Sequence, residues 1–175
     1  MYKRQTFTFA RWGRPIAPIV FGVEDETLRL LKGAIEAVTE LATHSLSETD
    51  PELGSNLMVF FFQDWKELCD VPKLDQIVPE LGSLTLKLEK AQANQYRFFR
   101  FDEAGGIKAC FSFIRMDEHL NAVSGEALCL SQTVQSILLW SDVAFQNVSP
   151  LALLPSGETI LPVSYTHLRA HETLD

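Results

Sequence analysis

The stretch that decides the fold is Gln95–Arg115, with the sequence QYRFFRFDEAGGIKACFSFIR. Its two halves, QYRFFRF and IKACFSFIR, are typical of strands, and the segment between them, DEAGG, is a turn with two glycines. The sequence therefore predicts an antiparallel hairpin. In the second half, apolar residues alternate with Lys108, Cys110 and Ser112, which predicts that this strand buries one face. The apolar positions are Ile107, Ala109, Phe111 and Phe113.

Two further strands are expected before this hairpin. Leu57–Phe62 (LMVFFF) is a continuous apolar run of strand length, which is typical of a central strand covered on both faces. Arg14–Gly22 (RPIAPIVFG) is also strand-like. Because proline cannot donate a hydrogen bond to a ladder, Pro15 and Pro18 place this strand early in the sheet or at its edge.

Helical periodicity indicates the remaining elements. A long helix is expected from Asp25 to about His44, and a short one after Asp64, with Glu67 completing a capping box. A further helical segment covers Leu74–Ala91, interrupted near Pro79. Ser124 can cap a last helix that extends to about Asp142, and 149–162 reads as irregular chain. The expected core face of that last helix consists of Ala127, Leu130, Val134, Ile137 and Leu138.

The order of these elements is strand, long helix, strand, helices, hairpin, helix. Such an order predicts an α+β fold with a mixed or mostly antiparallel sheet and packed helices. Because no linker or internal repeat interrupts the chain, we expect Thr6–Pro162 to form a single domain.

Both ends of the chain resemble translated adapter DNA. Val163–Thr173 (VSYTHLRAHET) can be back-translated as a transposon-end adapter used in short-read sequencing, and the reverse complement of that DNA encodes Met1–Gln5. We therefore expect 1–5 and 163–175 to be artefacts and the domain to be a fragment of a longer protein. His167 and His171 have the spacing of a helical zinc site, but this pair lies inside the adapter-like segment.

Composition excludes several classes of function. The net charge of −8, with no basic cluster, argues against nucleic acid and anionic membranes as partners. No apolar run is long enough for a membrane span. His44 and His119 lack spaced partners and are expected to be structural, and no C-x-x-C occurs, so we predict neither a metal nor another cofactor. Cys69, Cys110 and Cys129 are expected to be buried thiols, although export would allow a Cys110–Cys129 disulfide.

The last helix carries the candidate binding site. On a helical wheel, Ser131, Gln132, Gln135 and Asp142 lie opposite the expected core face, on a less buried side that would face a groove. Ser131-Gln132-x-x-Gln135 has the spacing of H-E-x-x-H, in which two imidazoles bind zinc and the glutamate activates water. A hydroxyl and two amides are weak ligands and provide no general base. We therefore predict no catalytic residues here; an ordinary amphipathic helix is the alternative.

The order of elements resembles that of the zincin fold, in which a signature helix follows the hairpin. The chain also resembles a proteobacterial family of uncharacterised proteins classed as lipoproteins. That resemblance rests on 11–16 (RWGRPI), Cys110-Phe111 and 129–135 (CLSQTVQ), beside the family's W-x-x-P-I, C-F and C-L-x-E-E-x-x-Q. Here Ser131-Gln132 replaces two glutamates, and the cysteine is displaced by one position. The resemblance implies a fold and a location in the periplasm or envelope, but no activity.

Three functions are compatible with these patterns. The first is a non-catalytic, zincin-like domain that binds a protein or peptide. The second is a hydrolase whose catalytic ligands lie in a missing C-terminal part. The third is a structural domain of a larger envelope protein.

Overall fold

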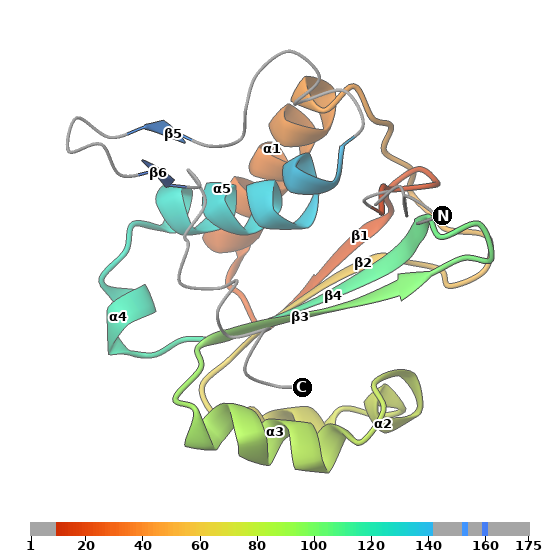
Figure 1. Cartoon of the computed structure of the whole chain (residues 1–175). Coiled ribbons are helices and arrows are strands. Elements are labelled where there is room, and N and C mark those ends of the chain that lie inside the picture. Colours follow the sequence, from red (N-terminus) through yellow and green to blue (C-terminus); the bar gives the residue numbers. More distant parts are fainter. Residues whose placement is uncertain (1–9, 142–151, 154–158, 161–175) are drawn as a thin grey trace, which may run out of the picture.

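The computed structural model describes 10–141, 152–153 and 159–160, and it shows an α+β fold built on a mixed sheet (Figure 1). The predicted fold class is therefore confirmed. The sheet contains β1 (Pro18–Phe21), β2 (Leu57–Phe62), β3 (Gln95–Phe101) and β4 (Ile107–Arg115). The predicted segments 1–5 and 163–175 and residue Asp142 lie outside the described residues.

The strand order of the sheet is β1-β2-β4-β3. β1, β2 and β4 are mutually parallel, whereas β3 pairs with β4 in the antiparallel sense. The prediction of a central strand at Leu57–Phe62 is confirmed, as is the placement of the proline-containing first strand at an edge. In this register one row of aromatic rings crosses all four strands, formed by Phe21, Phe60, Phe113 and Tyr96.

The parallel pairing of β1 and β2 requires a crossover, which α1 (Asp25–Leu41) provides. Gly22 begins the crossover with a φ of +78°, and a Cβ built there would lie 2.0 Å from the carbonyl oxygen of Phe61. Only glycine fits this close approach in the left-handed region.

The hairpin between β3 and β4 closes as the sequence predicted. The amide of Asp102 donates to the carbonyl oxygen of Gly106 at 2.8 Å, and the Asp102 carboxylate accepts from the amides of Ala104 and Gly106 at 2.9 and 2.8 Å. Gly105 provides the left-handed backbone that the turn requires, with a φ of +82°. β4 is thereby brought between β2 and β3, at the centre of the sheet.

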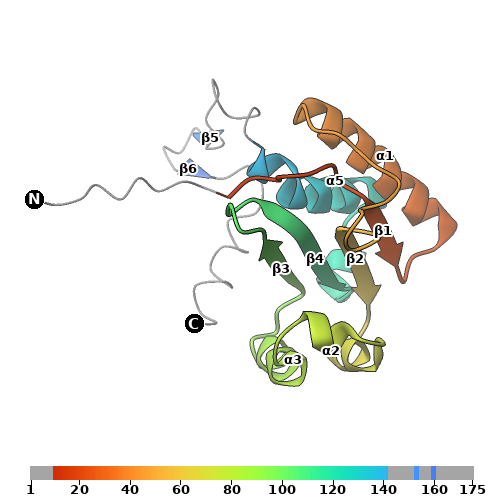
Figure 2. The same ribbon diagram turned by 90° about the vertical axis from the view of Figure 1, so that its right-hand side faces the viewer.

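Helices cover both faces of the sheet (Figures 1 and 2). One face carries α1 and α5 (Gly125–Ser136), which is followed by the short helix η2 (Leu138–Trp140). The other carries η1 (Trp65–Asp70), α2 (Leu74–Ile77) and α3 (Leu81–Lys90). We refer to these as the α5 face and the α3 face. The capping box predicted at Asp64 and Glu67 is present.

Double coverage corrects the prediction for β4. Ser112, which alternates with the residues of the expected buried face, is itself 1% exposed, because α5 covers the side of the strand to which it points. Cys110 on the same side is 0% exposed, in agreement with the buried thiol expected there. Three smaller elements were also not foreseen. A short helix, α4 (Glu118–Asn121), precedes α5, and β5 (Ala152–Leu153) pairs with β6 (Thr159–Ile160) within the segment expected to be irregular.

Candidate functional site

The polar face of α5 packs against β3 through one buried side chain, Arg97. Its guanidinium donates to Oε1 of Gln135 at 2.7 Å, to Oε1 of Gln132, and to Oγ of Ser136 at 3.3 Å. Gln132 in turn donates to Oε1 of Gln95 at 2.7 Å. Two of these residues come from β3 and three from α5, so the network joins the helix to the strand. We call these five residues the Arg97 network.

The predicted orientation of α5 is therefore wrong. Gln132 and Gln135 are 2% and 6% exposed, and Ser131 is half-buried and accepts from the Gln135 amide at 3.0 Å. Conversely, Leu130 of the expected core face is 50% exposed, and Ala127 is also exposed. The amides turn inward because a guanidinium lies opposite them, and a buried donor without an acceptor would cost more free energy than an exposed leucine.

The remaining part of the expected core face follows the prediction more closely. Ile137 is 1% exposed, and Val134 and Leu138 are half-buried. Val134 lies in the last turn of α5, whereas Ile137 and Leu138 follow the helix. The helix therefore buries apolar residues such as Leu128 and Cys129 on one side, and amides on the side that contacts β3.

Burial sets the electrostatics of the Arg97 network. Removal from water lowers the pKa of Arg97 to about 10, and burial raises the pKa of the neighbouring Cys110 thiol to about 12. At neutral pH the guanidinium is therefore charged and the thiol is neutral. Among the described residues, Arg97 has only neutral hydrogen-bond partners and forms no ion pair.

This arrangement is unsuited to metal-dependent hydrolysis. The amide oxygens of Gln132 and Gln135 are already bound by a cation, and that cation would repel a metal ion. Within the described part of the chain, His, Cys, Asp and Glu nowhere gather in a group of three or more that could hold a metal. The site can instead fix the position of β3 relative to α5.

β3 is an edge strand with backbone groups directed away from the sheet. The amide of Arg115 donates to the carbonyl oxygen of Asn94 at 2.8 Å, which fixes the alternation of the antiparallel ladder. The N–H and C=O groups of Gln95, Arg97 and Phe99 therefore point away from β4. No other strand of the described chain pairs with this edge.

A groove of about 180 Å³ lies beside β3 on the α3 face. Tyr96 and Phe98 of β3 form one wall, and Leu84 and Lys87 of α3 belong to the other. The further lining residues are Val78, Pro79, Glu80 and Ser83. The groove is lined by apolar side chains, with the charged residues Glu80 and Lys87 beside them. Such a lining can bind the apolar side chain of a peptide while the peptide's polar backbone stays near the charged residues.

Sequence reasoning missed Gln95 and Arg97. The signal was present in QYRFFRF, because Gln95, Arg97 and Phe99 share one face of a strand whose other face carries Tyr96 and Phe98. A guanidinium on a strand that is otherwise mostly aromatic will be buried with its neighbours, and it then requires hydrogen-bond acceptors. The side-chain amides of α5 are suitable acceptors.

The other predicted residues lie apart from the network. His119 is exposed on α4, and His44 follows α1, with Nε2 at 2.8 Å from the carbonyl oxygen of Arg14. All three cysteines are free: Cys110 and Cys129 are buried, whereas Cys69, expected to be buried, is exposed. None of the described helices has both the length and the apolar character needed to cross a membrane.

Comparison with known proteins gave no match to any family model, curated protein or solved structure.

Proposed function

We propose that this chain is a non-catalytic binding domain that takes an extended segment of a protein or peptide along the edge of β3. One observation carries the proposal: an antiparallel edge strand of 7 residues has outward backbone groups at three alternate positions and a groove beside it. Extended peptides commonly bind in this way, with main-chain hydrogen bonds giving affinity and pockets for alternate side chains giving specificity.

The geometry of strand addition assigns the contacts. An added strand would exchange hydrogen bonds with the backbone of Gln95, Arg97 and Phe99. Because side chains alternate along a strand, every second residue of the peptide would point toward the groove lined by Tyr96 and Phe98. An apolar residue suits that position, because Leu84 and Phe98 form much of the lining.

The Arg97 network supports the non-catalytic part of the proposal. Ser131, Gln132 and Gln135 have the spacing of a zinc-binding helix. The burial of Gln132 and Gln135 argues against direct contact with a peptide. We therefore give these glutamines the role of holding β3 in place, so that its outer edge is presented in a fixed register.

Substitution of Phe99 separates backbone recognition from side-chain packing. Phe99→Pro removes an outward N–H without breaking the ladder to β4, whereas Phe99→Ala removes the same ring and keeps the N–H. Both variants lose the contact with Trp140, whose ring centroid lies 4.8 Å from that of Phe99. Peptides are first selected on the unsubstituted protein from a displayed library of random linear sequences.

We expect Phe99→Ala to retain these peptides and Phe99→Pro to weaken them by about tenfold, the scale of one lost hydrogen bond, in calorimetric titrations. N-methylation of alternate peptide amides should have the same periodic effect. A library that yields no binders, or peptides indifferent to Phe99→Pro, would contradict strand addition.

A zinc titration tests the non-catalytic part. We expect no stoichiometric zinc in a chain that ends at Pro162 and so lacks His167 and His171. Metal analysis near one zinc per chain, or zinc-dependent cleavage of the selected peptides, would contradict this part alone and leave the test of strand addition intact.

A further inference from the structure

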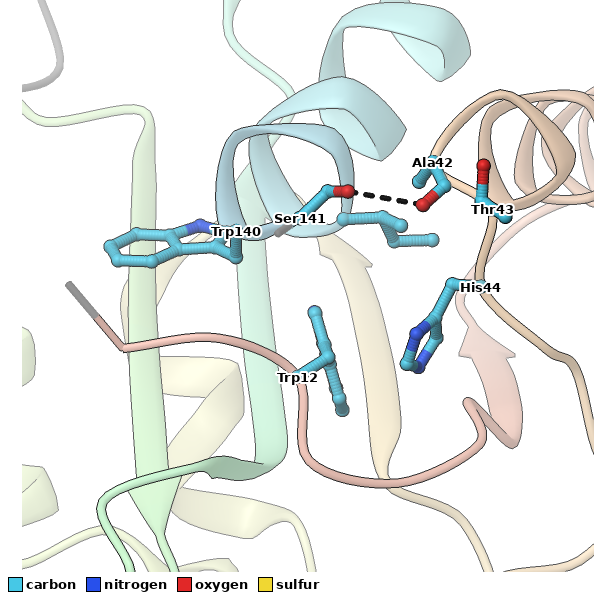
Figure 3. Close-up of a pocket in the computed structure, with 7 residues that line it drawn as sticks. Trp12, Ala42, Thr43, His44, Trp140 and Ser141 are labelled. Atoms are coloured by element: carbon cyan, nitrogen blue, oxygen red, sulfur yellow. Dashed lines mark hydrogen bonds between the residues drawn. The ribbon is translucent and has the colours of Figure 1, made fainter. Parts of the chain in front are cut away.

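A second pocket, of about 170 Å³, lies at the opposite end of α1 from Gly22, where α1, the chain before β1 and the end of α5 meet (Figure 3). It shares no lining residue with the groove beside β3. Its lining residues are Trp12, Ala42, Thr43, His44, Ile137, Trp140 and Ser141.

Three of the side-chain hydrogen-bond donors of this lining are already engaged. Two indoles and one hydroxyl donate to backbone carbonyl oxygens: Trp12 Nε1 to Ser136 at 2.8 Å, Trp140 Nε1 to Gln135 at 2.9 Å, and Ser141 Oγ to Ala42 at 3.0 Å. An indole has a single N–H, so neither tryptophan can donate to a ligand. A ligand that needs donors, such as a carboxylate or phosphate, therefore finds none among these three side chains.

Acceptors remain in the same pocket. Nε2 of His44 lies 2.8 Å from the carbonyl oxygen of Arg14, and a carbonyl can only accept, so Nε2 carries the proton. In the neutral ring Nδ1 is then an acceptor, and no described residue donates to it. The carbonyl oxygen of Ala42 has a second lone pair besides the one bound by Ser141. A ligand that brings donors is therefore complementary to these two acceptors.

The charge of the pocket favours a cation. Ala42 is the C-cap of α1, where the helix dipole is negative, and the last turn of α1 contains no basic residue. Figure 3 shows the indole of Trp12 edge-on, with one face turned toward His44, and an indole face attracts cations. The net charge of −8 acts in the same direction.

We propose that this pocket binds a small primary alkylammonium ion. The ammonium group donates to Nδ1 of His44 and to the carbonyl oxygen of Ala42, beside the face of Trp12, and the alkyl chain lies against Ile137. The size agrees, since a cavity of about 150 Å³ accommodates benzene, and a chain of about four carbons occupies less space.

Binding of n-butylammonium, followed by tryptophan fluorescence, tests the proposal. The Trp65→Phe protein serves as background, because Trp65 lies on the α3 face and would add an unrelated signal. We expect saturable binding of n-butylammonium, with n-butanol and butyrate at least about tenfold weaker, the ratio that one charged hydrogen bond supplies. Equal binding of butanol, or no saturation below about 10 mM, a very weak affinity, would overturn the proposal.

Substitutions of the two histidines localise the site. His44→Leu should weaken n-butylammonium by about tenfold, and His44→Gln, which keeps an acceptor and a donor, should recover much of the loss. His119→Leu is the matched control, because His119 is exposed on α4 and does not line the pocket. Equal affinities for His44→Leu and His119→Leu would place the ligand elsewhere and overturn the assignment.

Discussion

The two faces of the sheet have different interiors. On the α3 face, the buried cluster is apolar and largely aromatic, with Phe111, Phe113 and Trp65 among its most buried members. On the α5 face, the apolar cluster adjoins a buried cation and its glutamine partners. The α3 face gains stability from non-directional burial, whereas part of the α5 face depends on hydrogen bonds that only one relative position of α5 and β3 can satisfy.

The α3 face therefore contributes mainly to the stability of the fold, whereas the α5 face fixes the relative position of its elements. Apolar side chains on the α3 face tolerate small shifts, because burial does not depend on direction. The guanidinium of Arg97 does not, because its planar donors must meet Gln132 and Gln135 together. The edge that we propose to bind a peptide is therefore held by the more directional of the two interiors.

The largest expected effect is on the α3 face. Phe111 is 0% exposed, and Phe111→Ala should lower the free energy of unfolding by about 3–5 kcal/mol through lost burial and a cavity. Urea unfolding measures it, with Phe101→Ala as control, because Phe101 is 51% exposed. Similar losses for both variants would show that the α3 face is not the stronger interior.

On the α5 face, a single substitution in the Arg97 network should lower the free energy of unfolding strongly, whereas a combined apolar replacement of the network should not. Arg97→Met leaves the buried amide oxygens of Gln132 and Gln135 without their donor, and we expect a loss of about 2–4 kcal/mol in urea unfolding. Gln132→Ala should cost about 1–3 kcal/mol and be strongly non-additive with Arg97→Met.

Adding Gln95→Leu, Gln132→Leu and Gln135→Leu to Arg97→Met should restore most of the stability, since the apolar replacements remove the amides that would be left unpaired. The matched control is Leu130→Ala, which changes an exposed residue of the same helix and should stay within about 0.5 kcal/mol. Additive losses in the Arg97/Gln132 cycle would show that the network is not a unit.

The dependence of stability on alkaline pH gives a further test of the α5 face. Burial raises the pKa of Cys110 from 9.0 to about 12, so the folded thiol stays protonated where the unfolded thiol ionises. Ionisation then favours the unfolded chain, and stability falls between pH 9 and 10 by up to about 1.4 kcal/mol per pH unit. Cys110→Ala should reduce this slope without abolishing it, since burial also raises the pKa of Cys129. An unchanged slope would contradict the assignment.

The smallest effect is expected at Ser112, which lies on the α5 face beside the Arg97 network. Its hydroxyl oxygen is buried and has no hydrogen-bond partner among the described residues. Ser112→Ala removes this unsatisfied group, so urea unfolding should show a change close to zero or a small gain in stability. A loss above about 1 kcal/mol would indicate that the hydroxyl belongs to the network.

The sequence by itself determined the main helices and strands of the fold and one of its two interiors. LMVFFF, the DEAGG turn and the capping box at Asp64 predicted their elements correctly, because strand length, turn chemistry and capping depend on residues close together in the chain. The interruption near Pro79 was also found, since α2 ends at Ile77 and α3 begins at Leu81.

Tertiary structure alone decided which side of α5 is buried and whether β4 has an open face. Arg97 and Gln132 are 35 positions apart, and neither local pattern shows that a cation on β3 would lie opposite two amides on α5. The core face of a helical wheel is chosen by the hydrophobicity of the residues, that is, by the free energy of transfer from water to an apolar medium. By that measure the amide side chains belong on the exposed side. Here they are buried because a buried hydrogen bond to a charged group offsets their desolvation, and that partner exists only once the strand and helix have met.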